Sequence, residues 1–298
     1  MVVNQEIKIK HPSIKLFIKR EDLLHPVVSG NKFRKLKYNI IQAKEEKHTL
    51  LVTFGGAFSN HIAAVAYACK EAGLRSIGII RGDELEAEIE NNPTLKFAET
   101  CGMQFKFVSR EEYNQKTESS YKQVLIQKHG RHYLLPEGGT NQLAIKGCEE
   151  ILQDSDADFN YICCAIGTGG TISGIINSAK PHQKVLGFPA LKADFLTEEI
   201  TKFAKKDNWS LISDYHFGGY AKVTDELIAF MNEFYVNNNF LLDPVYTSKM
   251  VFGTLDLIEK GYFADNVKIL LIHTGGLQGI AGMNSFLEKK KKAKILIS

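Results

Sequence analysis

Short apolar runs alternate with segments of helical period along most of the chain. The runs that read as β-strands lie at 50–53, 76–80, 105–108, 161–166, 185–188 and 269–273. The helical segments beside them carry apolar residues three and four positions apart, as in Phe33, Leu36, Ile40 and Ala43 or in Ile62, Val65, Ala66 and Cys69. Buried strands that alternate with amphipathic helices are typical of parallel sheets covered by helices. The pattern therefore predicts an α/β fold.

Local signals mark the ends of several helices. Asn92 and Pro93 form a cap followed by a first-turn proline, and Gly102 stops the helix that they begin. Gly73 similarly follows the helix that carries Cys69. We therefore expect separate helices before Gly73 and before Gly102.

The 298 residues suffice for about two domains of roughly 100 to 200 residues each. No Ser/Gly/Pro-rich linker and no repeat divides the chain, so short crossings must join the domains. Turn-forming residues concentrate at 28–31, 55–60, 136–141, 167–171 and 274–279. Ligands of open α/β sheets bind at loops that follow the carboxyl ends of strands, so these segments are the expected site.

Composition excludes several classes of protein. With 44% hydrophobic and 24% charged residues, the chain is neither disordered nor fibrous. A net charge of only +3 gives no reason to expect a nucleic-acid partner. The single charge run, Lys289 to Lys292 with Lys294, is interpreted as a solvated terminal helix or a frayed tail.

Compartment and metal chemistry follow from what the sequence lacks. It has no apolar stretch of 18 residues and no export signal, so we expect a cytoplasmic protein without a membrane partner. The five cysteines are expected to be reduced and buried. Neither a metal motif nor the elbow of a serine hydrolase occurs, so no metal is expected.

The strongest local signal is a glycine-rich turn after the strand at 161–166. Small residues there let backbone N–H groups approach an anion, and the following helix start adds partial positive charge; the turn comprises Gly167, Thr168, Gly169, Gly170 and Thr171. Neither a dinucleotide fingerprint, which needs glycine where Ile172 stands, nor a P-loop fits. The turn therefore indicates a small phosphate-bearing ligand, or simply close helix packing.

Two further segments carry candidate chemistry. Lys32 stands in a polar turn before an amphipathic helix, where it is either a solvated cation or, if desolvated, an amine that forms an imine with an aldehyde. Ser59 and Asn60 open another helix after Gly55-Gly56, where amide donors suit a carboxylate. A plain N-cap would explain Ser59 but not the two glycines.

Taken together, these segments resemble one enzyme family. Six motifs occur in its order: Gly30-Asn31-Lys32-x-Arg34-Lys35-Leu36, Gly55-Gly56-x-x-Ser59-Asn60-His61, Pro136-Glu137-Gly138-Gly139-Thr140-Asn141, the 167–171 turn, Asp243-Pro244-Val245-Tyr246-Thr247 and His273-Thr274-Gly275-Gly276. They resemble the D-cysteine desulfhydrase and 1-aminocyclopropane-1-carboxylate deaminase family over about residues 19–276. The resemblance implies pyridoxal 5′-phosphate as cofactor and the fold-type II architecture of the tryptophan synthase β kind, with two doubly wound open-sheet domains.

The resemblance also implies a role for each matching residue. Lys32 would form the imine with the cofactor and take the substrate α-proton, and the 167–171 turn would hold the phosphate. Asn60 would face the phenolic oxygen, and Thr247 or, in preference, Thr274 the pyridine nitrogen. The substrate side would comprise Ser59 as catalytic hydroxyl, Tyr246 and Tyr220 on the substrate face, and a carboxylate site made by Gly56, Ser59, Asn60 and His61. We expect a large cofactor domain at 1–34 and 135–298, a small domain at 35–134, and a homodimer.

Two residues favour one reaction of this family. In the deaminases the motif tyrosine is followed by Glu, whereas Thr247 follows Tyr246 here, and a hydroxyl keeps the ring nitrogen protonated less well than a carboxylate. His61 also resembles the desulfhydrases, where the deaminases carry Gln. We therefore expect β-elimination from a small amino acid, D-cysteine first, giving pyruvate, ammonia and sulfide. The alternatives are aminocyclopropane-carboxylate deamination, a non-catalytic binding protein, and a nucleotide-binding domain, which Ile172 opposes.

Overall fold

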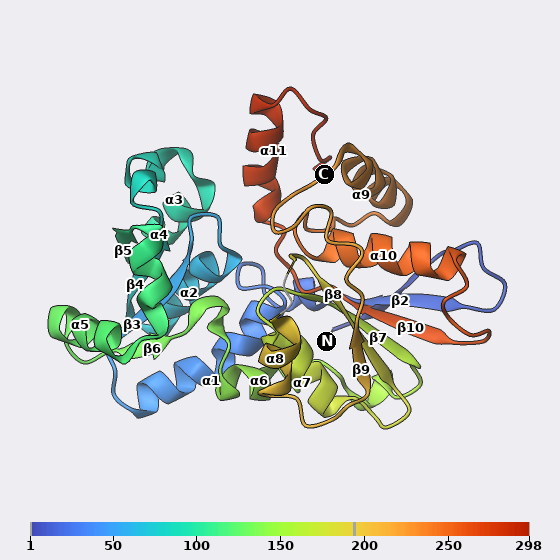
Figure 1. Cartoon of the computed structure of the whole chain (residues 1–298), viewed down its shortest axis with the longest axis horizontal. Helices are drawn as coiled ribbons and strands as arrows, with labels where there is room; N and C mark the ends of the chain where they lie inside the picture. Colours follow the sequence, from blue (N-terminus) through green and yellow to red (C-terminus); the bar gives the residue numbers. More distant parts are fainter. Residues whose placement is uncertain (1, 193–194, 298) are drawn as a thin grey trace.

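Two parallel-stranded sheets form the framework of the chain. The computed structural model describes residues 2–192 and 195–297. The larger sheet has the order β1-β2-β10-β7-β8-β9, with strands β1 (Asn4–Ile7), β2 (Lys15–Lys19), β7 (Tyr161–Ile166), β8 (Lys184–Pro189), β9 (Trp209–Leu211) and β10 (Lys268–Ile272). The smaller sheet has the order β5-β4-β3-β6, with strands β3 (Leu50–Gly56), β4 (Arg75–Arg81), β5 (Met103–Val108) and β6 (Tyr133–Leu135). Figure 1 shows the smaller sheet to the left and the larger sheet to the right.

The six strands that the apolar runs predict are confirmed as β3, β4, β5, β7, β8 and β10. Only β1 runs antiparallel to its neighbour among the strand pairs of the described residues. The pattern missed β1, β2, β6 and β9. These strands have only three to five residues, so any apolar run in them is too short to stand out. β1, β6 and β9 are edge strands, and β2 has only Leu16, Phe17 and Ile18 between two lysines.

Helices cover both faces of each sheet, which explains why the central strands are apolar throughout. In β7, Cys163 and Ala165 face one core cluster, whereas Ile162 and Cys164 face the other. In β3, Leu51 faces one cluster of the small sheet and Val52 the opposite one. A strand with apolar side chains on both sides gains stability only when it is buried on both faces. Each sheet is therefore the middle layer of a three-layer sandwich.

The helices begin and end close to the predicted signals. Their bounds are α1 (Asn31–Glu45), α2 (Asn60–Ala72), α3 (Pro93–Thr100), α4 (Arg110–Asn114), α5 (Ser119–His129), α6 (Gln142–Cys148), α7 (Gly170–Ser178), α8 (Leu196–Thr201), α9 (Asp225–Asn238), α10 (Thr247–Glu259) and α11 (Gly279–Lys289). The Asn92 side chain accepts N–H bonds from Thr94 and Leu95, and Gly73 closes α2 with φ of 70°. Both helix predictions are thus confirmed.

The division into domains remains a prediction. The small sheet and helices α2 to α5 come from the middle of the chain, and the large sheet comes from both ends. The expected boundary between residues 34 and 35 falls inside α1, and that between 134 and 135 falls inside β6. In Figure 1, α1 runs from below the smaller sheet to the middle of the molecule, so this one helix spans the expected boundary.

The terminal lysines agree with one of their two interpretations, whereas one cysteine needs a correction. Lys289 ends α11 and the lysines of the run are exposed, as expected of a solvated terminal helix. The segment after α11 is not frayed, because Lys292 pairs with Asp225 at 2.8 Å and Ile295 is buried against α9 and α11. All five cysteines are free thiols, and four are buried. Cys101, which we expected to be buried, is partly exposed because it caps the end of α3.

Candidate active site

A cleft of about 1630 Å³ is lined by strand ends and loops of both sheets. Each of the five turn-rich segments that the sequence marks contributes lining residues, although they lie up to about 250 positions apart. Loops at the carboxyl ends of β3, β6, β7 and β10 meet there, which is the expected location of a ligand site in parallel sheets. The cleft is therefore where the candidate residues must be compared.

Lys32 lies in this cleft on the first turn of α1. Gly30 before it has φ of 59°, and a Cβ there would lie 2.0 Å from the Thr274 carbonyl oxygen, so only glycine lets α1 start against the loop after β10. Burial, and after it the charge of Lys35, lowers the pKa of Lys32 from 10.5 to about 7. Near neutral pH much of this amine is therefore unprotonated and nucleophilic.

The glycine turn and a second lysine form a cradle beside Lys32. Lys35, one turn later on α1, donates through Nζ to the Gly138 carbonyl and to Thr140 Oγ1, both at 3.0 Å. A Cβ at Gly170 would lie 2.8 Å from Thr140 Oγ1 and 3.0 Å from Lys35 Nζ. Helix α7 begins in the same turn, and its first backbone N–H groups have no hydrogen-bond partners within the helix. A buried ammonium and a helix N-terminus at one small turn suit a phosphate.

The turn after β3 brings Ser59, Asn60 and His61 to the cleft. Ser59 caps α2, and its Oγ accepts the His61 backbone N–H at 3.2 Å, so the capping role of Ser59 is real. Asn60 reaches across to the loop after β10, because a Cβ at Gly276 would lie 2.7 Å from its Nδ2. The His61 ring is buried and bonds Thr53 Oγ1 through Nε2 at 2.8 Å. Burial, and then Lys32 and Lys35, lowers the pKa of His61, which favours a neutral ring.

Two tyrosines, Tyr246 and Tyr220, also line the cleft. Tyr246 precedes α10 and packs on the glycine turn, where a Cβ at Gly167 would lie 3.1 Å from its ring. Burial, and after it Tyr220, raises the pKa of Tyr246. Tyr220 meets Tyr246 edge-on with ring centroids 6.1 Å apart, and Tyr220 is 49% exposed. Tyr220 therefore stands at the entrance and Tyr246 deeper in the cleft.

The two threonines that the sequence left as alternatives differ in position. Thr247 is fully buried, and its hydroxyl and backbone N–H both donate to the Asp243 carboxylate. Thr274 lines the cleft beside Gly275 and Gly276. Of the two side chains, that of Thr274 is the one available to a ligand.

Of the ten lysines and arginines that line the cleft, sequence reasoning named only Lys32 as a site residue, and two of those that it missed lie beside predicted site residues. Lys35 belongs to the quoted motif and stands three residues after Lys32, a spacing that places both on one face of a helix and could have revealed it. Arg81 ends β4, and a Cβ at Gly56 would lie 4.0 Å from its guanidinium. Nothing in the local sequence distinguishes Arg81 from an ordinary surface arginine, because the neighbouring turn comes from another strand.

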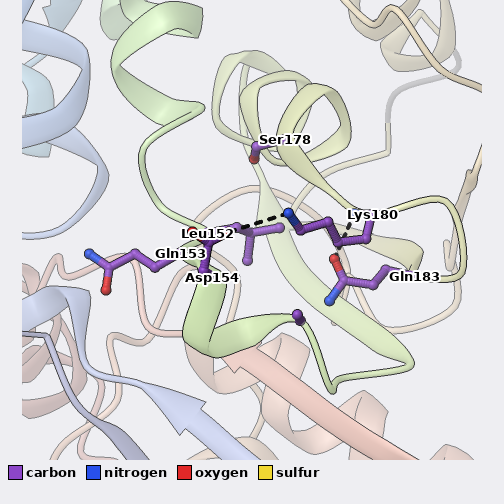
Figure 2. A pocket seen from close by; sticks show the side chains of 7 residues that line it. Leu152, Gln153, Asp154, Ser178, Lys180 and Gln183 are labelled. Carbon is purple, nitrogen blue, oxygen red and sulfur yellow. Dashed lines mark hydrogen bonds and ion pairs between the residues drawn. The ribbon is translucent and has the colours of Figure 1, made fainter.

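A second cavity, of about 340 Å³, lies apart from these residues (Figure 2). Lys180 pairs there with Asp154 at 3.3 Å, and the Lys180 backbone N–H donates to Gln183. Its polar groups thus bind one another. Within residues 2–192 and 195–297, no cluster of three His, Cys, Asp or Glu side chains could hold a metal, and no helix is long and apolar enough to cross a membrane.

The cleft residues fit the cofactor that the resemblance implies. An amine with a pKa of about 7 matches an aldehyde, and the Lys35 cradle matches a phosphate. Both features are on the first two turns of α1, so a single helix could hold both ends of one small molecule. The donor set therefore suits pyridoxal phosphate.

Comparison with known proteins agrees with this fit. A family profile described as pyridoxal-phosphate dependent enzyme matches residues 5–275. A bifunctional D-cysteine desulfhydrase/1-aminocyclopropane-1-carboxylate deaminase of Arabidopsis thaliana is 31% identical over 89% of this chain and 73% of its own length. A D-cysteine desulfhydrase of Klebsiella pneumoniae is 27% identical, covering 89% of this chain and 88% of its own.

Solved structures point the same way. The crystal structure of an ACC deaminase homologue superposes with a TM-score of 0.81 at 26% identity, covering 92% of this chain and 88% of that one. The structure of O-ureido-L-serine synthase, with a TM-score of 0.67 at 12% identity, shares the fold. The expected fold-type II architecture and the expected resemblance are confirmed. The chain belongs to the family of pyridoxal-phosphate dependent enzymes.

Proposed function

We propose that this enzyme eliminates a β-substituent from a small amino acid, with D-cysteine as substrate. D-cysteine and water would give pyruvate, ammonia and hydrogen sulfide. The observation that carries the proposal is the desolvated Lys32 amine beside the Lys35 cradle, facing Ser59 and Tyr246 across one cleft. The curated names of the Arabidopsis and Klebsiella relatives support the same chemistry.

Cofactor binding divides among four groups in this proposal. Lys32 would hold the aldehyde carbon, and Lys35 with Gly167, Thr168, Gly169, Gly170 and Thr171 would hold the phosphate. Asn60 would face the phenolic oxygen, and Thr274 would face the ring nitrogen. When bound, the cofactor supplies an aldehyde for the substrate amine and a ring that withdraws electrons from the α-carbon.

The remaining residues act on the substrate. Gly56, Ser59, Asn60 and His61 hold its carboxylate through N–H and hydroxyl donors. The unprotonated Lys32 amine would act as the base that removes the substrate α-proton. Ser59, Tyr246 and Tyr220 would lie around the leaving group of the substrate. The raised pKa of Tyr246 keeps its phenol protonated, so that it can donate a hydrogen bond.

Thr247 and His61 support desulfhydrase over deaminase activity. The residue that follows Tyr246 is Thr247 and not a carboxylate, and its hydroxyl donates to Asp243 inside the protein. Opening a cyclopropane demands more electron withdrawal than loss of sulfide from a cysteine. A ring nitrogen that meets only a hydroxyl at Thr274 therefore suits the easier elimination.

The test is an assay of the purified protein with D-cysteine, L-cysteine, D-serine and aminocyclopropane carboxylate. We expect sulfide and pyruvate from D-cysteine and no 2-oxobutanoate from the cyclopropane. In Lys32→Ala we expect the release of sulfide and pyruvate to be lost. Formation of 2-oxobutanoate without sulfide would establish the deaminase instead. A yellow protein without turnover of any amino acid would establish a non-catalytic binding protein.

The oligomeric state and compartment complete the proposal. We propose a homodimer, as the family resemblance implies, and a cytoplasmic location. Light scattering of the purified protein measures its mass against the 33.4 kDa of one chain. A monomer would contradict the first part of this proposal.

A further inference from the structure

Lys249 is a buried lysine outside the cofactor cradle. Lys249 is only 1% exposed. It lies on the first turn of α10, three positions after Tyr246. Its Nζ donates to three backbone carbonyls: His216 and Gly219, both at 2.9 Å, and Ala190 at 3.3 Å. A buried ammonium is unfavourable unless all its donors are used, and three acceptors match its three N–H bonds. The chain therefore builds a specific carbonyl cage around this cation.

Two of the three carbonyls belong to the turn that leads into Tyr220. The backbone of this turn is strained: Phe217, Gly218, Gly219 and Ala221 all have positive φ, between 52° and 122°. L-residues such as Phe217 and Ala221 rarely adopt these values, so the turn needs contacts from outside to keep its shape. The Lys249 ammonium provides such contacts on both sides of Gly218.

Lys249 thus connects the segments that carry the two tyrosines. Tyr246 immediately precedes the helix that holds Lys249, and Tyr220 follows the turn that Lys249 binds. The two rings meet edge-on with centroids 6.1 Å apart, although Tyr220 is half exposed and Gly219 has open space around its Cα. Because the half-exposed Tyr220 side chain has little packing of its own, its position depends on the turn that precedes it in the chain.

We propose that Lys249 is a positioning residue that holds the 216–219 turn on α10 and thereby sets Tyr220 against Tyr246 at the substrate face. This inference rests on the proposed function, because it gives Tyr220 a place in the reaction. Burial lowers the pKa of Lys249 to about 8, which still leaves the ammonium charged near neutral pH. Lys249 itself touches neither substrate nor cofactor.

The first test needs no activity. Lys222 follows the turn and is exposed, so trypsin cleavage after Lys222 reports how well the turn is held. We expect Lys249→Met, which keeps the length of the side chain without its charge, to be cut there at least about 10-fold faster than wild type. Lys184→Met, at an exposed lysine that begins β8, is the matched control and should behave as wild type. Equal cleavage rates in Lys249→Met and wild type would overturn the proposal.

The second test is kinetic and separates positioning from general damage. We expect Lys249→Met to lose about 100-fold in kcat for sulfide release, as misplacement of a reacting group by about 1 Å does, while cofactor absorbance and its affinity stay as in wild type. In a Tyr220→Ala background the same change should cost less than about twofold, because residues that act as one unit are not additive. Losses that multiply in the double variant would contradict the proposal.

A further variant covers the case in which Lys249→Met does not fold. Gly219→Ala adds a methyl group into open space but disfavours φ of 122°, so it loosens the turn from the acceptor side, at a carbonyl that Lys249 binds, while the Lys249 side chain itself stays unchanged. We expect faster cleavage after Lys222 and a similar fall in kcat. If Gly219→Ala loosens the turn and leaves kcat unchanged, the turn does not position Tyr220. If wild type releases no sulfide, the proposed function fails, and the cleavage assay still decides whether Lys249 holds the turn.

Discussion

Two lysines one helical turn apart have different environments and hence different tasks. Burial lowers the pKa of both lysines, that of Lys32 to about 7. Lys32 Nζ makes one long hydrogen bond, to Asn31 Oδ1 at 3.4 Å, whereas Lys35 Nζ donates to a carbonyl and a threonine hydroxyl, both at 3.0 Å. An amine that must attack an aldehyde has to lose its proton, and one that holds a phosphate has to keep it. The sequence alone cannot divide these tasks, because both are lysines of one motif.

The lowered pKa of Lys32 predicts the pH dependence of its reactivity. In protein freed of cofactor, labelling of Lys32 by trinitrobenzenesulfonate should rise about tenfold per pH unit up to about pH 7 and then level off, because only the neutral amine reacts. Peptide mapping measures the rate at each lysine. Exposed Lys37, whose pKa its hydrogen bond to Glu150 raises, serves as internal control and should continue to rise beyond pH 9. Parallel curves for Lys32 and Lys37 would contradict the prediction.

The cradle predicts that Lys35 recognises the phosphate alone. Lys35→Met should weaken binding of pyridoxal phosphate about 10- to 150-fold, the value of a charged hydrogen bond of about 1.5–3 kcal/mol. Binding of pyridoxal, which lacks the phosphate, should change little. Lys37→Met, two residues along the same helix, is the control. Fluorescence titration of both ligands distinguishes the outcomes, and an equal loss for both would show that Lys35 only supports the fold.

At the scale of elements, agreement between sequence and structure follows burial. Strands β3, β4, β7, β8 and β10 are buried nearly throughout, so their sequences are apolar runs that periodicity detects. Strands β1, β2, β6 and β9 have only three to five residues, so even the apolar Leu16-Phe17-Ile18 of β2 is too short a run for periodicity to detect. Caps were the other dependable signal, because a side chain that binds two N–H groups is a local feature of the sequence.

The cap of α3 predicts a local cost in stability. Asn92→Ala removes the acceptor of two backbone N–H bonds, to Thr94 and Leu95, both at 3.0 Å. We expect the free energy of unfolding to fall by about 1 kcal/mol, with unchanged sulfide release, because α3 lies outside the cradle. Urea denaturation measures it. Asn91→Ala, at the neighbouring exposed residue, should have less than half the effect; equal effects would show that the cap contributes nothing specific.

At the scale of the whole molecule, the fold collects charge that is sparse along the chain. Ten Lys and Arg residues but only two Glu line the cleft, although the chain as a whole has a net charge of +3. A cleft of one sign attracts anions, and both a phosphate and an amino-acid carboxylate are anions. This concentration could not be predicted from the sequence, because Arg81, Lys116, Lys222 and Lys290 come from four separate segments of the chain.

Motif order allowed several cleft residues to be predicted, whereas contacts between distant segments required the structure. Lys32, Ser59, Asn60, Tyr246 and the glycine turn all line the cleft as expected, because each stands in a recognisable local motif. The choice of Thr274 over Thr247 depends on which hydroxyl faces the cleft, and the role of Lys249 on carbonyls up to 59 positions away. Such features are three-dimensional and leave no local pattern.

The central claim is that the Lys32 amine holds the pyridoxal aldehyde. The most direct measurement is borohydride reduction of the protein with bound pyridoxal phosphate, followed by digestion and mass spectrometry of the labelled peptide. We expect a single reduced pyridoxyl group on Lys32 in the wild type and no labelled peptide in Lys32→Ala. A label on Lys35, Lys249 or a surface lysine, or an unlabelled Lys32 in a yellow protein, would contradict it.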